Sequence, residues 1–234
     1  MLQKFFSKLS FYLCRICTPV KVNRLSPRPI KIGSLYGGWF VDIRFLSKPL
    51  NVVSVGAGED ISFDLMLAST YPVNKLIIVD PTPRAISHFQ HLEHLIYNSK
   101  PLPNQYQFSN KILKVLRELF IQNKIYFEKF AIWRFNGQIK FFPPKNNSHV
   151  SHSIVSLPHS QKTDELALDV PCITPDSLFS KNNISTIDIL KLDIEGAEHV
   201  VLDMIFKSSI QPKQILVEYD ELFYFRLSHI YRFY

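Results

Sequence analysis

Residues 50–58, Leu-Asn-Val-Val-Ser-Val-Gly-Ala-Gly, decide the fold that this sequence predicts. The first six residues form an apolar, largely β-branched run, which is typical of a strand buried on both faces of a parallel sheet. The two glycines suit a tight turn at which a ligand can approach the backbone. Residues 61–70 then follow a helical pattern, so the stretch predicts one strand–turn–helix unit.

Strands and helices continue to alternate along the chain. Further strands are expected at 76–79, 125–133, 139–142, 187–194 and 214–219, and further helices at 83–98, 111–121, from Pro175, and 197–207. The dipeptide Asn136-Gly137 predicts a hairpin between the strands at 125–133 and 139–142. The repeated units predict an α/β fold with a doubly wound, mostly parallel sheet.

The charge of the chain is concentrated near its N-terminus. The 234 residues carry a net charge of +7, but residues 1–50 hold nine Lys or Arg against one acid, which leaves residues 51–234 nearly neutral. A neutral body without a basic stripe argues against a nucleic-acid partner. The three cysteines are too few for a disulfide framework, which favours a reducing compartment and predicts a cytoplasmic protein.

Residues 1–34 form a basic arm that begins with an amphipathic helical pattern. The apolar positions from Leu2 to Leu13 share one helical face, and Lys8 and Arg15 shorten the apolar run far below what a membrane-spanning helix needs. Two interpretations stay open: residues 2–15 contact an anionic membrane surface from the cytoplasmic side, or the helix docks on its own domain.

The residues that end the first two predicted strands favour a nucleoside ligand. Ligands of such sheets bind beyond the carboxyl ends of the strands, where the strand order reverses. Gly56 and Gly58 end the first strand, and Asp80 ends the second, twenty-four residues after Gly56. An acid there commonly accepts hydrogen bonds from a ribose diol, so the pattern predicts an adenosine-containing ligand. The alternative for Asp80 is a helix cap.

Three carboxylates lie at the end of the strand at 187–194, within Asp193-Ile194-Glu195-Gly196-Ala197-Glu198. Acids at this edge can take a proton from a hydroxyl, and we favour that role for Asp193. For Glu198 we favour the alternative, an acid that suits the positive end of a helix. The histidines have no spacing that predicts a metal site.

Three stretches together resemble the FkbM-type methyltransferases: 53–64 (Val-Ser-Val-Gly-Ala-Gly-Glu-Asp-Ile-Ser-Phe-Asp), 78–83 (Ile-Val-Asp-Pro-Thr-Pro) and 188–198 (Asp-Ile-Leu-Lys-Leu-Asp-Ile-Glu-Gly-Ala-Glu). The resemblance covers about residues 35–220 and makes 35–234 the methyltransferase domain. It implies a Rossmann-like class I fold and S-adenosylmethionine as cofactor. It also implies O-methylation, at a hydroxyl of a sugar, a glycan or a secondary metabolite.

The resemblance also assigns roles to residues at the carboxyl ends of the strands. Gly56 and Gly58 would lie against the methionine end of the cofactor, and Asp80 would hold its ribose. Phe130 and Ala131, ending the third strand, would flank adenine. The roles nearest the chemistry go to Asp193 and Glu195, which would face the methyl group and the acceptor.

One position departs from the family pattern. Many methyltransferases carry an acid two residues before the first glycine to hold the methionine amine, whereas this chain has Ser54. Glu59 or Asp60 would have to replace that acid.

Three other interpretations stay open. A nicotinamide-dependent oxidoreductase would need a third glycine that is absent after Gly58. The second is a non-catalytic or truncated module that keeps the fold, and the third is nucleic-acid methylation, which the neutral body opposes.

The C-terminal tail is short for a seven-stranded sheet. Only fifteen residues follow Tyr219, and their apolar spacing predicts a helix. We therefore expect five parallel strands without the last two of the fold. The strand at 214–219 would lie at an edge open to self-association, with low stability and little activity.

Overall fold

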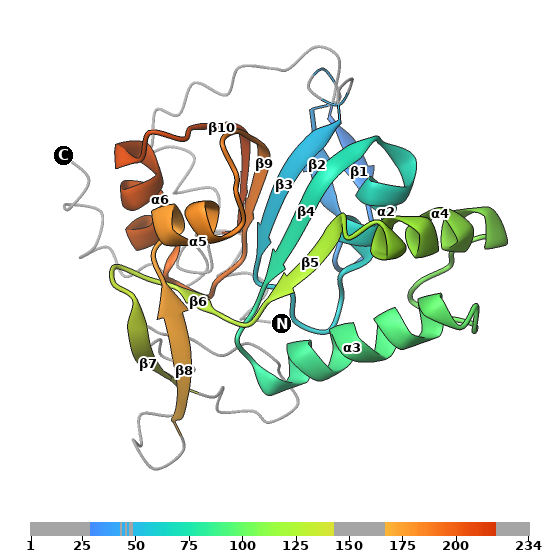
Figure 1. The fold of residues 1–234 in the computed structure, drawn as a ribbon, viewed down its shortest axis with the longest axis horizontal. Helices are drawn as coiled ribbons and strands as arrows, with labels where there is room; N and C mark the ends of the chain where they lie inside the picture. The colour runs from blue at the N-terminus through green and yellow to red at the C-terminus, as the bar shows by residue number, and fades with distance from the viewer. Residues whose placement is uncertain (1–28, 43, 45, 47–48, 143–166, 219–234) are drawn as a thin grey trace, which may run out of the picture.

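The computed structural model describes residues 29–42, 44, 46, 49–142 and 167–218 (Figure 1). The helix predicted within residues 2–15 and the helix predicted after Tyr219 lie outside the described residues. None of the helices within these ranges is long and apolar enough to cross a membrane.

A five-stranded parallel sheet forms the centre of the molecule (Figure 1). Its strands, in spatial order, are β10 (Pro212–Val217), β9 (Ile187–Leu192), β3 (Leu50–Val55), β4 (Val73–Val79) and β5 (Ile125–Glu128). The chain extends from β3 to one side through β4 and β5, then returns to the other side of β3 with β9 and β10. The strand order therefore reverses between β3 and β9, and the predicted doubly wound sheet is confirmed, with β10 at one edge.

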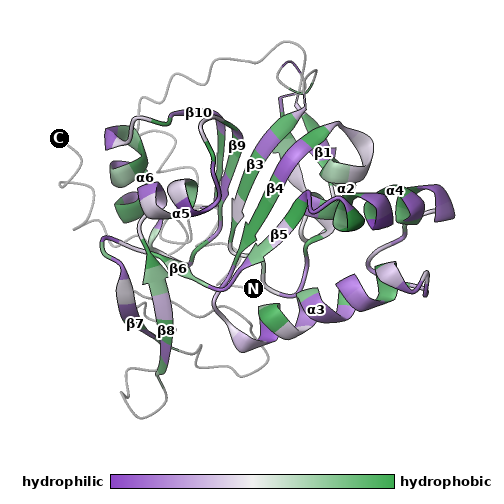
Figure 2. Cartoon of the chain, in the orientation of Figure 1, coloured by the Kyte–Doolittle hydropathy of each residue, from purple (hydrophilic) through white to green (hydrophobic). Residues whose placement is uncertain are grey.

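Side chains of alternating strand residues enter two separate cores. Val52, Leu76 and Ile189 belong to the first core, together with the helices α2 (Ser62–Thr70), α3 (Pro83–Tyr97) and α4 (Asn110–Ile121). The neighbouring strand residues face the second core under α5 (Pro175–Lys181) and α6 (Glu198–Lys207). Figure 2 shows the apolar strands between helices with polar outer faces. This two-sided burial explains why the strands form continuous apolar runs in the sequence.

Two small sheets accompany the central one. β1 (Ile30–Ile32) and β2 (Trp39–Val41) pair in antiparallel fashion. The segment that contains β1 and β2 contacts the central sheet directly after β2, where Asp42 N donates to Gln214 Oε1 of β10. The second small sheet consists of β6 (Ala131–Ile132), β8 (Leu168–Ile173) and β7 (Gly137–Phe141), in that spatial order.

The predicted hairpin across Asn136-Gly137 is wrong. The expected strand at 125–133 splits after Glu128, and its second part, β6, pairs with β8 rather than with β7. β8 lies between β6 and β7 and supplies the partners of both. The Asn136 side chain accepts from Thr174 N and donates to Ser177 Oγ, so it anchors the start of α5 instead of closing a two-residue turn.

Candidate functional site

The carboxyl ends of β3, β4 and β9 bring the three predicted loops together. These loops are the glycine turn 56–58 after β3, residues 80–82 after β4, and the acidic loop 193–196 after β9. Gly56 N donates to Val79 O at 2.9 Å, and Asp193 N donates to Val55 O at 3.1 Å. The three loops therefore form one continuous edge at the point where the strand order reverses, which we call the carboxyl edge.

The two glycines of the turn have different surroundings, so a side chain at each would meet different obstacles. Gly56 has a φ of +85°, and a Cβ atom added there would lie 1.8 Å from the carbonyl oxygen of Asp193. The close approach of the acidic loop thus demands a glycine. Gly58 has a φ of +52°, but no heavy atom lies within 4 Å of the place a Cβ would take. Gly58 therefore faces open space, where a ligand can approach the backbone.

Asp80 joins the glycine turn to the start of α3. Its Oδ2 accepts from Ala57 N at 2.9 Å and from Gly58 N at 3.0 Å. Its Oδ1 accepts from Thr82 N at 2.8 Å and from Thr82 Oγ1 at 2.6 Å. These four bonds fill the acceptor sites of a carboxylate. Asp80 thus ties two loops together, and holding a ribose would require it to exchange one of these bonds.

Glu198 organises the acidic loop. Glu195 has a φ of +52° and Gly196 a φ of +93°, so two consecutive residues are in the left-handed region. The fully buried Glu198 accepts from Ile194 N at 3.1 Å and from Gly196 N at 3.2 Å through Oε1. It lies in the first turn of α6, as the sequence predicts. Its contacts with the loop show that it also holds the backbone on either side of Glu195.

The two candidate catalytic residues lie on this loop with partly exposed side chains. The Asp193 carboxylate is 33% exposed, and its Oδ2 lies 3.6 Å from the Lys191 Nζ. Glu195 is of intermediate exposure at the tip of the loop. Lys191 is absent from the site residues that the sequence predicts, which are all carboxylates in this loop. A lysine inside the apolar run Ile-Asp-Ile-Leu-Lys-Leu was the available signal, because lysine is rarely buried without a partner.

Ser54 occupies the position at which many methyltransferases carry an acid, and this position is buried beneath the glycine turn. Ser54 is fully buried and faces Asp64 of α2, which is 1% exposed. Burial raises the pKa of the Asp64 carboxyl, and the positive charge of Lys191 opposes that rise. Neither Ser54 Oγ nor Asp64 Oδ1 has a hydrogen-bond partner within the described part of the chain. The carboxyl group of Asp64 in α2 therefore lies near Ser54, although Ser54 itself is not an acid.

The two proposed replacements for that acid already have partners. Glu59 forms an exposed ion pair with Arg84 at the start of α3, with 2.5 Å between Oε2 and the guanidinium. Asp60 accepts from Ser62 N and from the hydroxyl of Ser34, which lies between β1 and β2. Both acids lie directly after the glycine turn, so they remain within the carboxyl edge.

Phe130 and Ala131 do not end the third strand of the sheet, contrary to expectation. Glu128 ends it, and its carboxylate accepts from Lys181 Nζ and from Asn182 Nδ2. Phe130 is partly buried against the second core, with Lys181 Nζ 5.7 Å from its ring centroid. Ala131 is 3% exposed and pairs with Cys172 in the small sheet. Of the two residues, only Phe130 keeps a partly accessible side chain.

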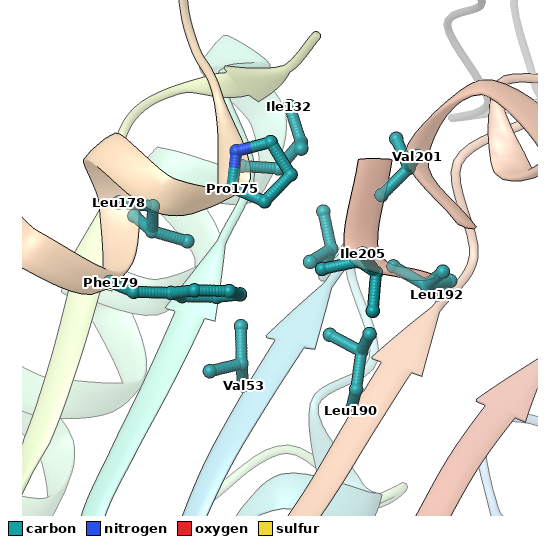
Figure 3. A pocket seen from close by; sticks show the side chains of 10 residues that line it. Val53, Ile132, Pro175, Leu178, Phe179, Leu190, Leu192, Val201 and Ile205 are labelled. Carbon is teal, nitrogen blue, oxygen red and sulfur yellow. The ribbon is translucent and has the colours of Figure 1, made fainter. Parts of the chain in front are cut away.

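A separate apolar pocket lies between the sheet and α5 and α6 (Figure 3). Side chains such as Val53, Leu190, Phe179 and Ile205 line it, and no charged side chain reaches it. It is a narrow gap between packed apolar side chains of the second core, and such a lining does not suit a charged ligand. Among the residues with described positions, no group of three His, Cys, Asp or Glu side chains could hold a metal ion.

Comparison with known proteins adds one finding. A family model described as the Methyltransferase FkbM domain matches residues 72–233. The match includes Asp80 and the whole acidic loop. Searches of curated proteins and of solved structures found no match.

Proposed function

The chain belongs to the FkbM methyltransferase family, and from this premise we propose that it transfers a methyl group from S-adenosylmethionine to a hydroxyl group of a sugar, a glycan or a secondary metabolite. The observation that carries the proposal is the family match over residues 72–233, which include Asp80 and Asp193. The carboxyl edge joins these two residues to the glycine turn that precedes the matched range. A methyltransferase fold needs these loops in one place to hold cofactor and acceptor together.

The charges of the carboxyl edge fit this cofactor. Residues 56–60, 80–82 and 193–196 contain five acids, and two of these acids have a basic neighbour outside the loops. Arg84 pairs with Glu59, and Lys191 lies near Asp193, so the acids outnumber the bases at this edge. S-adenosylmethionine carries a positive sulfonium and a positive amine, which such an edge attracts. Gly58 and the acids Glu59 and Asp60 would hold its methionine end, Asp80 its ribose and Phe130 its adenine. The bound cofactor supplies an electrophilic methyl group.

Asp193 is the residue best suited to the acceptor. Its carboxylate is partly exposed, and its backbone is fixed by the bond from Asp193 N to Val55 O. It would accept the proton of the acceptor hydroxyl, and Glu195 would orient the acceptor from the tip of the loop. Holding the hydroxyl oxygen in line with the transferred methyl group supplies most of the rate, so a weak base suffices.

The geometry after Gly58 disfavours the nicotinamide alternative. The third glycine of a dinucleotide motif would occupy position 61, where Ile61 is 1% exposed within the first core. Its backbone N donates to Tyr106 Oη at 3.1 Å. A buried isoleucine thus occupies the position at which the dinucleotide motif needs a glycine for close packing of the helix on the strand.

Calorimetry and methyl transfer test the proposal together. We expect the chain to bind S-adenosylmethionine and S-adenosylhomocysteine but not NAD, and to transfer a labelled methyl group to a glycan or metabolite extract. Asp193→Asn should lower turnover far more than cofactor affinity. Cofactor binding without transfer to any extract would favour the non-catalytic module, and absence of binding would contradict the proposal.

A further inference from the structure

Lys191 is the most unusual side chain near the carboxyl edge. It is 4% exposed, lies next to the end of β9 and pairs in register with Ser54 of β3. Burying an ammonium group is costly unless nearby groups compensate its charge. The contacts of this side chain therefore indicate what its charge does.

The ammonium group of Lys191 contacts both loops of the candidate site. Nζ donates to the carbonyl oxygen of Gly56 at 2.6 Å and lies 3.6 Å from Asp193 Oδ2. Gly56 is the residue whose φ of +85° permits the close approach of the acidic loop. One cation thus binds the backbone of the glycine turn and the carboxylate of the candidate base.

Two further elements surround the same cation. The ring centroid of Trp39 in β2 lies 5.0 Å from Nζ, which is a cation–π distance. Asp64 of α2 is buried nearby and feels the positive charge of Lys191. Lys191 therefore links β2, α2, the glycine turn and the acidic loop, although it is itself covered.

We propose that Lys191 is a positioning residue, whose ammonium group fixes the Gly56 carbonyl and the Asp193 carboxylate so that the carboxyl edge is preformed for the cofactor. The proposal rests on the function proposed above. It assigns Lys191 no contact with cofactor or acceptor. Preformed geometry strengthens binding because less order has to be created when the ligand arrives.

Lys191→Met tests the ammonium group specifically, because methionine keeps most of the aliphatic stem. Lys213→Met is the matched control: Lys213 Nζ pairs with Asp188 at 2.5 Å near the amino ends of β10 and β9, away from the carboxyl edge. Two measurements apply to both variants. Amide hydrogen exchange by NMR reports the Ala57 and Gly58 amides, and calorimetry reports the affinity for S-adenosylhomocysteine.

In Lys191→Met we expect the amides of Ala57 and Gly58 to exchange about tenfold faster and the affinity to fall about tenfold. Amides in β10 should exchange as in the wild type. Lys213→Met should change neither the turn amides nor the affinity. Wild-type exchange and affinity in Lys191→Met would overturn the proposal, and so would equal acceleration of all amides, which indicates general destabilisation.

Two additions keep the test decisive. If Lys191→Met does not fold, Lys191→Arg replaces it as the test, because arginine keeps the charge but alters the donor geometry. In Lys191→Arg we expect faster exchange of the turn amides and a loss of affinity relative to the wild type. Unchanged values in that variant would refute the positioning role. Exchange is measured without cofactor, so it decides the role of Lys191 even if wild-type protein binds no S-adenosylmethionine and the proposed function fails.

Discussion

Gly56 and Gly58 show how two neighbouring glycines can serve different purposes. Both have positive φ, but only Gly56 faces another backbone, the Asp193 carbonyl. We expect Gly56→Ala to lower the free energy of unfolding by about 3 kcal/mol or more, or to prevent folding, because a loop must move. Gly58→Ala should cost only about 1–2 kcal/mol, the cost of left-handed backbone. Urea denaturation compares the two, and equal losses would contradict the assignment.

Asp80 has two candidate roles: it acts as a clamp that ties the glycine turn to the start of α3, or it accepts hydrogen bonds from a ribose. Asp80→Ala removes the acceptor of the Ala57 and Gly58 amides, so we expect a loss of stability of about 1–3 kcal/mol in the free protein. Denaturation without ligand measures this loss, and calorimetry measures the accompanying loss of cofactor affinity. If affinity falls while stability is unchanged, Asp80 acts as ribose acceptor and its clamp bonds contribute little.

At the scale of elements, the connection between β9 and α6 carries a measurable strain. Glu195 is a non-glycine residue with a φ of +52°. We expect Glu195→Gly to be more stable than Glu195→Ala by about 1 kcal/mol, although glycine is normally the less stable choice. Both variants remove the side chain, so the comparison isolates the backbone. Thermal unfolding of the pair checks this, and a more stable alanine variant would argue against strain.

The elements that the sequence predicted well have either a continuous apolar run or a clear helical pattern. β3 and β9 are apolar on both faces, and α3 and α4 have one apolar face, so all four lie within a few residues of their expected bounds. β8 was missed because Leu-Asp-Val-Pro-Cys-Ile contains a proline and an aspartate and follows a polar stretch. β1 and β2 have three residues each, which is too short for any period to appear.

At the scale of the whole molecule, the sheet topology explains which site residues could be predicted from the sequence. Gly56, Asp80 and Asp193 were predictable because each directly follows a strand, and parallel strands share one carboxyl edge. A lysine within an apolar run was a local signal for position 191, but the contacts of Lys191 and of Asp64 were not predictable, because they depend on which strand face meets α2. That pairing follows from the β3–β9 register and from the first core, which no local pattern reveals. The self-association expected at β10 stays a prediction.

A hydrogen-bonded chain connects α3, the segment at 98–109 and the start of α2. Tyr106 Oη accepts from Ile61 N at 3.1 Å and lies 2.7 Å from His88 Nε2. The Tyr106 hydroxyl can donate to this nitrogen only when His88 is neutral and Nε2 carries no proton. Burial lowers the pKa of His88 from its usual 6.5, as does nearby His91 to a smaller extent, whereas Glu59 and Asp60 raise it. Protonation would leave the Tyr106 hydroxyl facing two donors.

The sign of the resulting pH dependence follows from this lowered pKa. Because the folded protein binds the His88 proton less tightly than the unfolded chain, the stabilisation is present above the unfolded value of 6.5 and is lost as pH falls through the lower folded value. Glutamine keeps an acceptor for the Tyr106 hydroxyl but does not titrate. We therefore expect the stability of the wild type relative to His88→Gln to decrease between about pH 8 and about pH 5. Urea denaturation of both proteins across that range measures the difference, and parallel pH profiles would show that His88 does not couple the start of α2 to pH.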